Sequence, residues 1–383
     1  MQGRVAIVGV GEVPPGRYEA YSENELAILA IRAALRDAGL SKDAIEGFYG
    51  GANGVVSDLL FSAAIAEQLR IEPRAMAEVA CGATSGMLAL RYAMAEILLG
   101  RIETALVFAS EKELTVSTGE WNRAMAKSFG EDLPFGPTVP AYYAMVAQRY
   151  MFEYGARPEH LAMVAVKNRR HARLNPHAMF RDPITVEDVL NSRPVATPLR
   201  LLDCAPRADG AAALVLVSAE RARRLARRPV WITGYGEQHD SSNFMLEKKP
   251  LTSFFAAPLA ARQAYEMAGR GPDDMDLVEI YEPFTICEII LSEDLGFFPK
   301  GEGYRALEAG LTAREGRLPV NTSGGRLSLG HPAFVTGLLM LTYLVRQLRG
   351  EAGPAQLPGV RTALAQSEHG MNNGVVVVIL EVS

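Results

Sequence analysis

The chain has 383 residues, of which 49% are hydrophobic, and it carries a formal net charge of −5. A chain of this length can bury a large core and form two or three domains, and its acidic balance gives no support to a nucleic-acid-binding protein. Three cysteines with no metal-site spacing and no even disulfide set are typical of a reducing compartment. With no apolar leader and no apolar run of 18 residues, the sequence predicts a cytoplasmic enzyme without a membrane span and without a metal.

The first predicted elements recur later in the chain. Residues 5–12 have the pattern of a buried strand that runs into a glycine-containing turn, and residues 230–237 repeat it. The amphipathic run 26–39 recurs at 259–269, and both runs end in Ala-Gly. Two further pairs of segments match in the same order: 104–106 with 362–364, and 210–217 with 374–380.

The most informative pair of repeats carries a thiol in one copy and an imidazole in the other. Residues 80–100 and 330–350 each read as a small-residue turn followed by an apolar helix that ends at glycine, and they place Cys81 and His331 at equivalent helix starts. A helix N-terminus lowers the pKa of a thiol and offers free backbone N–H groups to an oxyanion. This pairing predicts acyl transfer through a thioester.

The ordered repeats predict two α/β halves, residues 1–228 and 229–383, which are joined near residues 226–228. The first half would carry the nucleophile and an inserted loop domain at about 112–205, which has no counterpart of similar length in the second half. Because loops on a rigid scaffold usually carry specificity, we expect the insertion to cover the apolar part of the substrate.

Four segments resemble the signature regions of the thiolase superfamily: Glu78 to Gly86, Asp203 to Ala213, Asn321-Thr-Ser-Gly-Gly-Arg-Leu-Ser-Leu-Gly-His-Pro332, and Glu368 to Gly374. The resemblance covers essentially the whole chain and is greatest to the sterol-carrier-protein-type, or lipid-transfer-protein-type, thiolases. It implies a duplicated five-layered α-β-α-β-α fold with halves related by a pseudo-two-fold axis. It also implies homodimers or dimers of dimers, CoA thioester substrates and no permanently bound cofactor. We expect an edge strand at residues 105–109 to pair across the dimer axis.

The resemblance also assigns roles to individual residues. Cys81 would take up the acyl group of a 3-oxoacyl-CoA, and the thiol of a second CoA would then attack the acyl-enzyme. His331 would lie close to the sulfur, favour the thiolate and bind the thioester oxygen of the departing enolate. The backbone N–H groups of Cys81 and Gly370 would form the oxyanion hole. The alternative for Cys81 is a small buried residue in a helix start.

Two departures from the family pattern leave the acid/base group open. Many thiolases have a second cysteine two residues before the glycine that aligns with Gly370, where this chain has Glu368, followed by His369. Sterol-carrier-type members can instead use the cysteine of a His-Asp-Cys-Phe motif, where this chain has Tyr281-Glu-Pro-Phe. The proton must then be moved by His369, Glu368 or Tyr281, or by Cys287 one turn further along. We favour His369 because an imidazole titrates near working pH, although it could simply bind a loop carbonyl.

The residues named above are compatible with three functions. Cys81 and the Gly-His-Pro element at His331 favour a thiolase (acyl-CoA:CoA C-acyltransferase) of lipid or aromatic degradation, which cleaves a 3-oxoacyl-CoA or catalyses the reverse Claisen condensation. Thiolase-like retro-aldolases that cleave a 3-hydroxyacyl-CoA use a tyrosine in a segment comparable to that of Tyr281, but they lack the nucleophilic cysteine. The third reading is a non-catalytic acyl-CoA or lipid carrier. The resemblance further implies a small zinc-ribbon and OB-fold partner protein, and it leaves the acyl group open between short, aromatic and steroid-sized.

Overall fold

The computed structural model describes residues 4–55, 57–127, 134, 136, 138–225, 228–240 and 249–382. Its main sheet has nine strands in the order β3-β2-β4-β7-β1-β8-β11-β10-β9. The first half contributes β1 (Val5–Gly16), β2 (Gly47–Gly51), β3 (Ala75–Val79), β4 (Thr104–Glu111) and β7 (Asp209–Ser218). The second half contributes β8 (Val230–His239), β9 (Leu277–Ile280), β10 (Thr362–His369) and β11 (Gly374–Glu381).

The two halves of this sheet share one pairing pattern. β7 pairs antiparallel with both β1 and β4, as β11 does with β8 and β10. β2 pairs in parallel with β4, as β9 does with β10. The second-half counterpart of β3 is a single parallel bridge between Val278 and Val320. The repeated pattern confirms the duplicated α/β fold predicted from the sequence.

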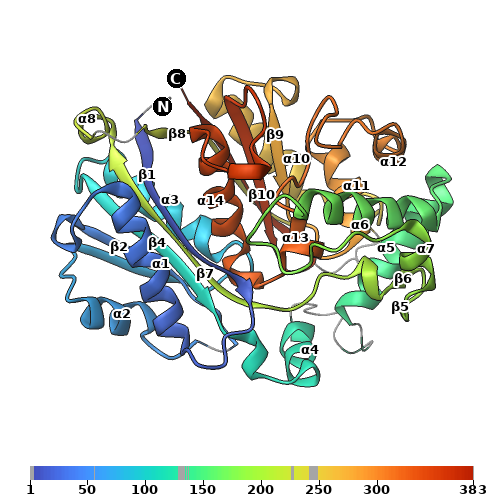
Figure 1. Ribbon diagram of the computed structural model, residues 1–383, viewed down its shortest axis with the longest axis horizontal. Helices are drawn as coiled ribbons and strands as arrows, with labels where there is room; N and C mark the ends of the chain where they lie inside the picture. The colour runs from blue at the N-terminus through green and yellow to red at the C-terminus, as the bar shows by residue number, and fades with distance from the viewer. Residues whose placement is uncertain are drawn as a thin grey trace.

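The helices and the two half-sheets alternate in five layers, α-β-α-β-α (Figure 1). The outer face of the first half packs against α1 (Glu23–Ala38) and α2 (Phe61–Leu69), and that of the second half against α10 (Ala256–Ala268) and α11 (Thr285–Asp294). Between the halves lie α3 (Ser85–Leu98) and α14 (Thr336–Arg349), in a core that contains residues of both half-sheets. α14 is buried almost all round, as a helix enclosed on both sides must be.

The segment inserted between β4 and β7 packs against the other half of the molecule. It contains α4 (Thr118–Ala126), α5 (Val139–Tyr154), α6 (Pro158–Ala172), α7 (Val186–Asn191) and a hairpin of β5 (Pro194–Ala196) and β6 (Leu199–Arg200). The rings of Tyr143 on α5 and Phe284 at the start of α11 stack with centroids 4.7 Å apart, and Lys167 on α6 pairs with Glu288 on α11 at 3.0 Å. α5 and α6 accordingly lie beside α11, and α7 packs against α6 (Figure 1).

Among the described residues, the other α-helices are α8 (Ala219–Ala222), α12 (Gly303–Glu308) and α13 (Gly325–Leu329). The expected junction at residues 226–228 includes Ala226 and Arg227, which lie outside the described residues; β7 and α8 precede it and β8 follows. None of the helices in the described ranges is long and apolar enough to span a membrane.

The expectation of an edge strand at residues 105–109 is wrong. These residues lie in β4, which is paired on one side with β2 and on the other with β7. The outermost strand of the first half is β3, where the side chain of Met76 is 43% exposed. The sequence did not indicate that further strands lie outside β4, because three of the five residues of β2 are glycines and the strand therefore has no apolar alternation.

Glycines at equivalent positions of β1 and β8 let the outer helices approach the sheet. A Cβ atom at Gly11 would overlap the carbonyl oxygen of Ala30 on α1, and one at Gly236 would overlap that of Ala260 on α10. Both clashes are with helix backbone, which cannot rotate away as a flexible side chain can. The same helix-to-sheet contact is therefore built in the same way in each half.

Gly236→Ala should therefore destabilise the protein by about 1–3 kcal/mol through overpacking. The matched control is Gly119→Ala on α4, where the nearest atom to the new methyl group is the end of the Arg123 side chain at 3.6 Å. We expect the control to keep or slightly raise Tm, because alanine is a better helix former than glycine. Equal melting temperatures for Gly236→Ala and the wild type in thermal denaturation would contradict this account.

Candidate active site

A tight turn between β3 and α3 positions Cys81, which is half-buried. The backbone N–H of Cys81 donates to Ser85 Oγ at 2.8 Å, and the Thr84 hydroxyl donates to the Cys81 carbonyl oxygen at 2.6 Å. Gly82 adopts a left-handed conformation with φ of 55°, and a Cβ atom there would lie 2.7 Å from Cβ of His369. The turn is thus closed by its own side chains and packs against the end of β10.

The thiol of Cys81 does not have the lowered pKa expected for a residue in the first turn of a helix. Burial raises its pKa, and a hydrogen bond from Thr84 lowers it only in part. The reason is that α3 begins at Ser85, after the turn, while the sulfur is withdrawn from water. The backbone N–H of Cys81 would also have to leave Ser85 before it could bind an oxyanion.

Cys81 opens onto a cavity of about 640 Å³, a volume in the range of small-molecule sites. Apolar side chains from β3, α3 and β11 form part of its wall, and ionisable side chains form the rest. The lining residues are Val79, Cys81, Leu88, Arg91, Tyr92, Glu237, Gln238, His239, His369, Val375 and Val376.

His369, at the end of β10, lies beside the Cys81 turn. Its Nδ1 is 2.9 Å from Thr84 Oγ1, and its Nε2 is 3.1 Å from Nδ1 of His239, whose ring stacks on it at 5.3 Å and 13°. Burial, followed by the neighbouring His239, lowers the pKa of His369 to about 4. His369 is therefore a neutral imidazole at neutral pH, hydrogen-bonded at both ring nitrogens.

Glu368 is buried and bonded to different partners. Its carboxyl group accepts hydrogen bonds from the Tyr143 hydroxyl at 3.1 Å and from the backbone N–H of Asn372. Because neighbouring residues of a strand point to opposite faces, Glu368 faces the inserted helices while His369 faces Cys81. Burial raises the pKa of Glu368 to about 8, and the two hydrogen bonds oppose this rise.

Tyr281 and His331 form a second pair of candidate residues. The Tyr281 hydroxyl is 2.7 Å from Nε2 of His331. Burial, followed by the charges of Arg326 and Arg207, lowers the pKa of His331 to about 3. Burial also raises the pKa of Tyr281 well above its usual value, with Glu368 as the next cause. The bond therefore joins two neutral groups.

Cys287 is fully buried on α11, and burial, then the charge of Glu368, raises the pKa of its thiol well above the ordinary value. Gly370 is in the left-handed region with φ of 69°, and its backbone nitrogen is 3.9 Å from the position that a Cβ atom of Gly82 would take. The structure therefore brings Gly370 to the Cys81 turn and keeps Cys287 in the core.

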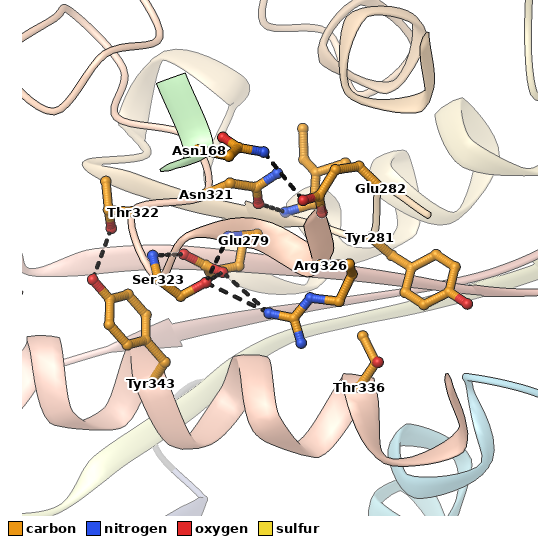
Figure 2. Close-up of polar contacts among 12 residues, drawn as sticks. Asn168, Glu279, Tyr281, Glu282, Asn321, Thr322, Ser323, Arg326, Thr336 and Tyr343 are labelled. Atoms are coloured by element: carbon orange, nitrogen blue, oxygen red, sulfur yellow. Dashed lines mark hydrogen bonds and ion pairs between the residues drawn. The ribbon is translucent and has the colours of Figure 1, made fainter. Parts of the chain in front are cut away.

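The segment before His331 is anchored to both neighbours of Tyr281 (Figure 2). Asn321 Oδ1 accepts from the backbone N–H of Ile280 at 2.7 Å. A Cβ atom at Gly325, which has φ of 57°, would overlap the carboxyl group of Glu282. The Asn-x-x-Gly-Gly element therefore positions the chain that leads to His331 against the segment that carries Tyr281.

The starts of α3 and α14 touch each other in the middle layer. A Cβ atom at Gly337 would lie 3.3 Å from the carbonyl oxygen of Ala83 and 3.0 Å from the side chain of Met87. The Ser367 hydroxyl of β10 also donates to the carbonyl oxygen of Ala83, at 2.9 Å. The turns that carry Cys81 and His331 thus belong to the same end of the middle layer.

Sequence reasoning missed three residues of this region: Thr84, Tyr143 and His239. Thr84 follows Cys81 by three residues in the segment Glu78 to Gly86, and this short spacing was a signal that Thr84 lies in the same turn as the thiol. His239 follows the repeated strand 230–237 by two residues, but its partner His369 could be found only from the strand order. Among the residues that the structure describes, no group of three or more His, Cys, Asp or Glu side chains is arranged to hold a metal ion.

Comparisons with known proteins identify the family. Residues 5–220 match the model of the thiolase N-terminal domain, and residues 236–382 match that of the thiolase C-terminal domain-like family. The chain belongs to the thiolase family.

Three relatives indicate the range of activities in the family. The acetyl-CoA acetyltransferase of Methanothermobacter thermautotrophicus is 37% identical over 378 residues, covering 98% of each chain. The benzoylsuccinyl-CoA thiolase subunit BbsB of Thauera aromatica is 35% identical, covering 94% of this chain and 93% of its own. The solved Ltp2-ChsH2(DUF35) aldolase is 31% identical with a TM-score of 0.87, covering 99% of this chain and 98% of its own.

The raised pKa of Glu368 predicts a pH-dependent contribution to stability. The folded state keeps the proton up to about pH 8, whereas an unfolded glutamate releases it near pH 4.5, so stability should fall between these values. The loss should approach about 1.4 kcal/mol per pH unit and be absent in Glu368→Gln. Urea unfolding of both proteins at pH 5 and pH 8 measures this difference. A wild type whose stability relative to Glu368→Gln stays constant with pH would contradict the assignment.

Proposed function

We propose that this protein is a thiolase that cleaves a 3-oxoacyl-CoA with a second CoA, or catalyses the reverse Claisen condensation, through an acyl group on Cys81. The observation that carries the proposal is the placement of Cys81 and His369 on one cavity of about 640 Å³, where the Thr84 hydroxyl donates to the Cys81 carbonyl oxygen and lies 2.9 Å from Nδ1 of His369. A carrier without catalysis would not need an imidazole beside a thiol, so the carrier reading has no support from this arrangement.

In the first half-reaction the Cys81 sulfur attacks the 3-oxo carbon, and the bond between C2 and C3 breaks. The acyl group stays on Cys81, and C2 leaves as the enolate of a shorter acyl-CoA, which must take up one proton. We assign the proton transfer to His369, which would take the Cys81 thiol proton as the sulfur attacks and pass it to C2, because its ring is connected to the Cys81 turn through the hydroxyl of Thr84. In the second half-reaction the CoA sulfur attacks the thioester, the bond between the acyl carbon and Cys81 breaks, and the CoA thiol proton passes through His369 to the released Cys81 sulfur.

The Tyr281–His331 pair fits the oxyanion site of the enolate. A neutral His331 can donate from a ring nitrogen to the thioester oxygen while its partner Tyr281 fixes the ring orientation. The low pKa of His331 favours this neutral form over an imidazolium. Tyr281 then acts through His331 and not on the carbon skeleton.

The second candidate function is retro-aldol cleavage of a 3-hydroxyacyl-CoA. The short hydrogen bond between Tyr281 and His331 favours it, since a tyrosine paired with an imidazole can exchange a proton with a hydroxyl group. The likeness to an aldolase structure at 31% identity supports it as well. We rank it second because Cys81 and its cavity would then have no role.

We further propose a homodimer in which the exposed edge strand β3 pairs with its counterpart in a second copy. A separate small zinc-ribbon and OB-fold partner protein is also proposed. The relative BbsB is named as a subunit, and the solved aldolase is named as a pair of Ltp2 with ChsH2(DUF35); both names support a second polypeptide.

Iodoacetamide should modify Cys81 before the two other cysteines. Cys81 opens onto the cavity, whereas Cys287 is fully buried and burial raises the pKa of Cys204 to about 12. Peptide mass spectrometry after brief treatment should find the label on Cys81, and an acyl-CoA substrate should protect it. Faster labelling of Cys204 would remove Cys81 from the mechanism.

Steady-state assays of three variants should separate thiolase from aldolase. For a thiolase, 3-oxoacyl-CoA cleavage requires free CoA, Cys81→Ala abolishes it, and His369→Ala lowers kcat by about 10²–10⁴-fold. Tyr281→Phe should keep much of the activity because it only orients His331. For an aldolase, a 3-hydroxyacyl-CoA is cleaved without CoA, Tyr281→Phe is inactive and Cys81→Ala is tolerated. CoA-independent cleavage by Cys81→Ala would exclude the thiolase mechanism.

A further inference from the structure

Tyr281 lies just beyond the end of a strand. β9 ends at Ile280, which forms the last parallel pair with β10. The backbone N–H of Tyr281 still donates to Gln366 of β10, while its hydroxyl reaches His331. Because the ladder stops one residue earlier, the position of Tyr281 also depends on what holds its two neighbours, Ile280 and Glu282.

Two asparagine side chains hold the residues on either side of Tyr281 (Figure 2). The backbone N–H of Ile280 donates to Asn321 Oδ1 at 2.7 Å. On the other side, Glu282 Oε1 accepts from Asn168 Nδ2 at 3.1 Å. Asn168 lies on α6 of the inserted segment and is fully buried. The bond to Glu282 therefore joins the inserted segment to the chain that carries Tyr281.

Glu288 on α11 connects the two asparagines. Its Oε2 accepts from Nδ2 of Asn168 at 3.1 Å and from Nδ2 of Asn321 at 2.8 Å. Together with the backbone of residues 280–282, these bonds form a closed ring, which we call the amide ring; its side chains are Asn168, Glu282, Glu288 and Asn321. All four side chains are at most 3% exposed. Because water is excluded from these groups, their hydrogen bonds can fix the geometry of the backbone.

Lys167 fixes the orientation of the neighbouring Asn168 amide. Its ammonium group donates to Asn168 Oδ1 at 2.8 Å and to the carbonyl oxygen of Val320 at 2.8 Å, and it pairs with Glu288 Oε1 at 3.0 Å. An ammonium group donates and cannot accept, so Oδ1 of the amide must face Lys167. Both hydrogens of Nδ2 then face carboxyl groups, and the whole amide has partners in this one arrangement.

Gly325 leaves the space that the bond between Asn168 and Glu282 occupies. A Cβ atom at Gly325 would overlap Glu282 Oε1 and would lie 2.7 Å from Asn168 Nδ2. The backbone N–H of Leu327 donates to the same Oε1 at 3.4 Å. Gly325 and Leu327 belong to α13, which ends one residue before Gly330 and His331. The inserted segment, the end of β9 and the helix that leads to His331 thus meet at one carboxyl group.

We propose that Asn168 is a positioning residue that holds the Tyr281 hydroxyl against His331 through its bond to Glu282. This inference rests on the proposed function, in which Tyr281 acts through His331. It gives the inserted segment a role in the chemistry besides covering the substrate. Burial raises the pKa of the Glu282 carboxyl group well above its usual value, so the bond from Asn168 joins two neutral groups.

The test observes the ring of His331 by NMR in protein with isotope-labelled histidine. His331→Gln assigns the signal, and Tyr281→Phe shows the shift that loss of the hydroxyl causes. We expect Asn168→Ala to move the His331 signal in the same direction as Tyr281→Phe, because the hydroxyl is no longer held against Nε2. In a Tyr281→Phe background, Asn168→Ala should cause a smaller shift, because the bond is already absent.

Turnover of the same variants should agree with the NMR signal. In Asn168→Ala, kcat for 3-oxoacyl-CoA cleavage should fall about two- to fivefold, as in Tyr281→Phe, which is the effect of one neutral hydrogen bond. KM should not change, because Asn168 is buried away from the substrate. The double variant should be no slower than the slower single variant, because both changes remove the same interaction.

Val164→Ala is the matched control. Val164 is fully buried one turn earlier on α6, where it packs in the apolar core and not in the amide ring. This control should lower Tm and leave both kcat and the His331 signal at their wild-type values. Asn168→Leu removes the same bonds as Asn168→Ala but fills the space, so it should repeat the effects and serves if the alanine variant does not fold. Thermal unfolding checks that each variant is folded.

A wild-type His331 signal in a folded Asn168 variant would overturn the proposal, as would losses of kcat that multiply in the double variant. Because the NMR signal does not depend on turnover, it is separate from the proposed function. That function fails if an acyl-CoA does not acylate Cys81 in the wild type, as seen by intact-protein mass spectrometry, whatever the signals of the variants.

Discussion

The close contact between α3 and α14 at their first turns is the constraint on which the rest of the site depends. Gly86 and Gly337 remove the side chains that would keep these helices apart, so Leu338 fits against one backbone and Met87 against the other. Since each helix belongs to a different half, this contact sets the relative position of two separately built turns. Both turns, and therefore Cys81 and His331, take their places from it.

Burial then gives the site its chemical character. At neutral pH it makes His331 and His369 neutral, with pKa values of about 3 and about 4, and keeps Glu368 protonated, with a pKa of about 8. It also raises the pKa of Cys81. The candidate groups are therefore joined by hydrogen bonds between uncharged partners.

The sequence predicted the duplication and the two turns because these depend on local patterns: a strand that ends in glycine, and an apolar helix after a small-residue turn. It did not predict the outer position of β3, because the glycine-rich β2 gives no apolar alternation. It also missed His239, because its contact with His369 exists only in the order β8-β11-β10 and only across Gly374. The expected helix effect on Cys81 was outweighed by desolvation, which depends on tertiary packing.

The inserted segment gives the duplicated architecture an asymmetry. Its helices α5 and α6 are encoded in the first half but are packed into the core of the second, through contacts such as Tyr143 with Phe284 and Lys167 with Glu288. If the chain were cut between β7 and β8, the first fragment would expose that apolar surface and the second would lose its cover. The duplicated halves are thus no longer independent modules: each fragment would need the other to complete its core, and only the joined pair is a folding unit.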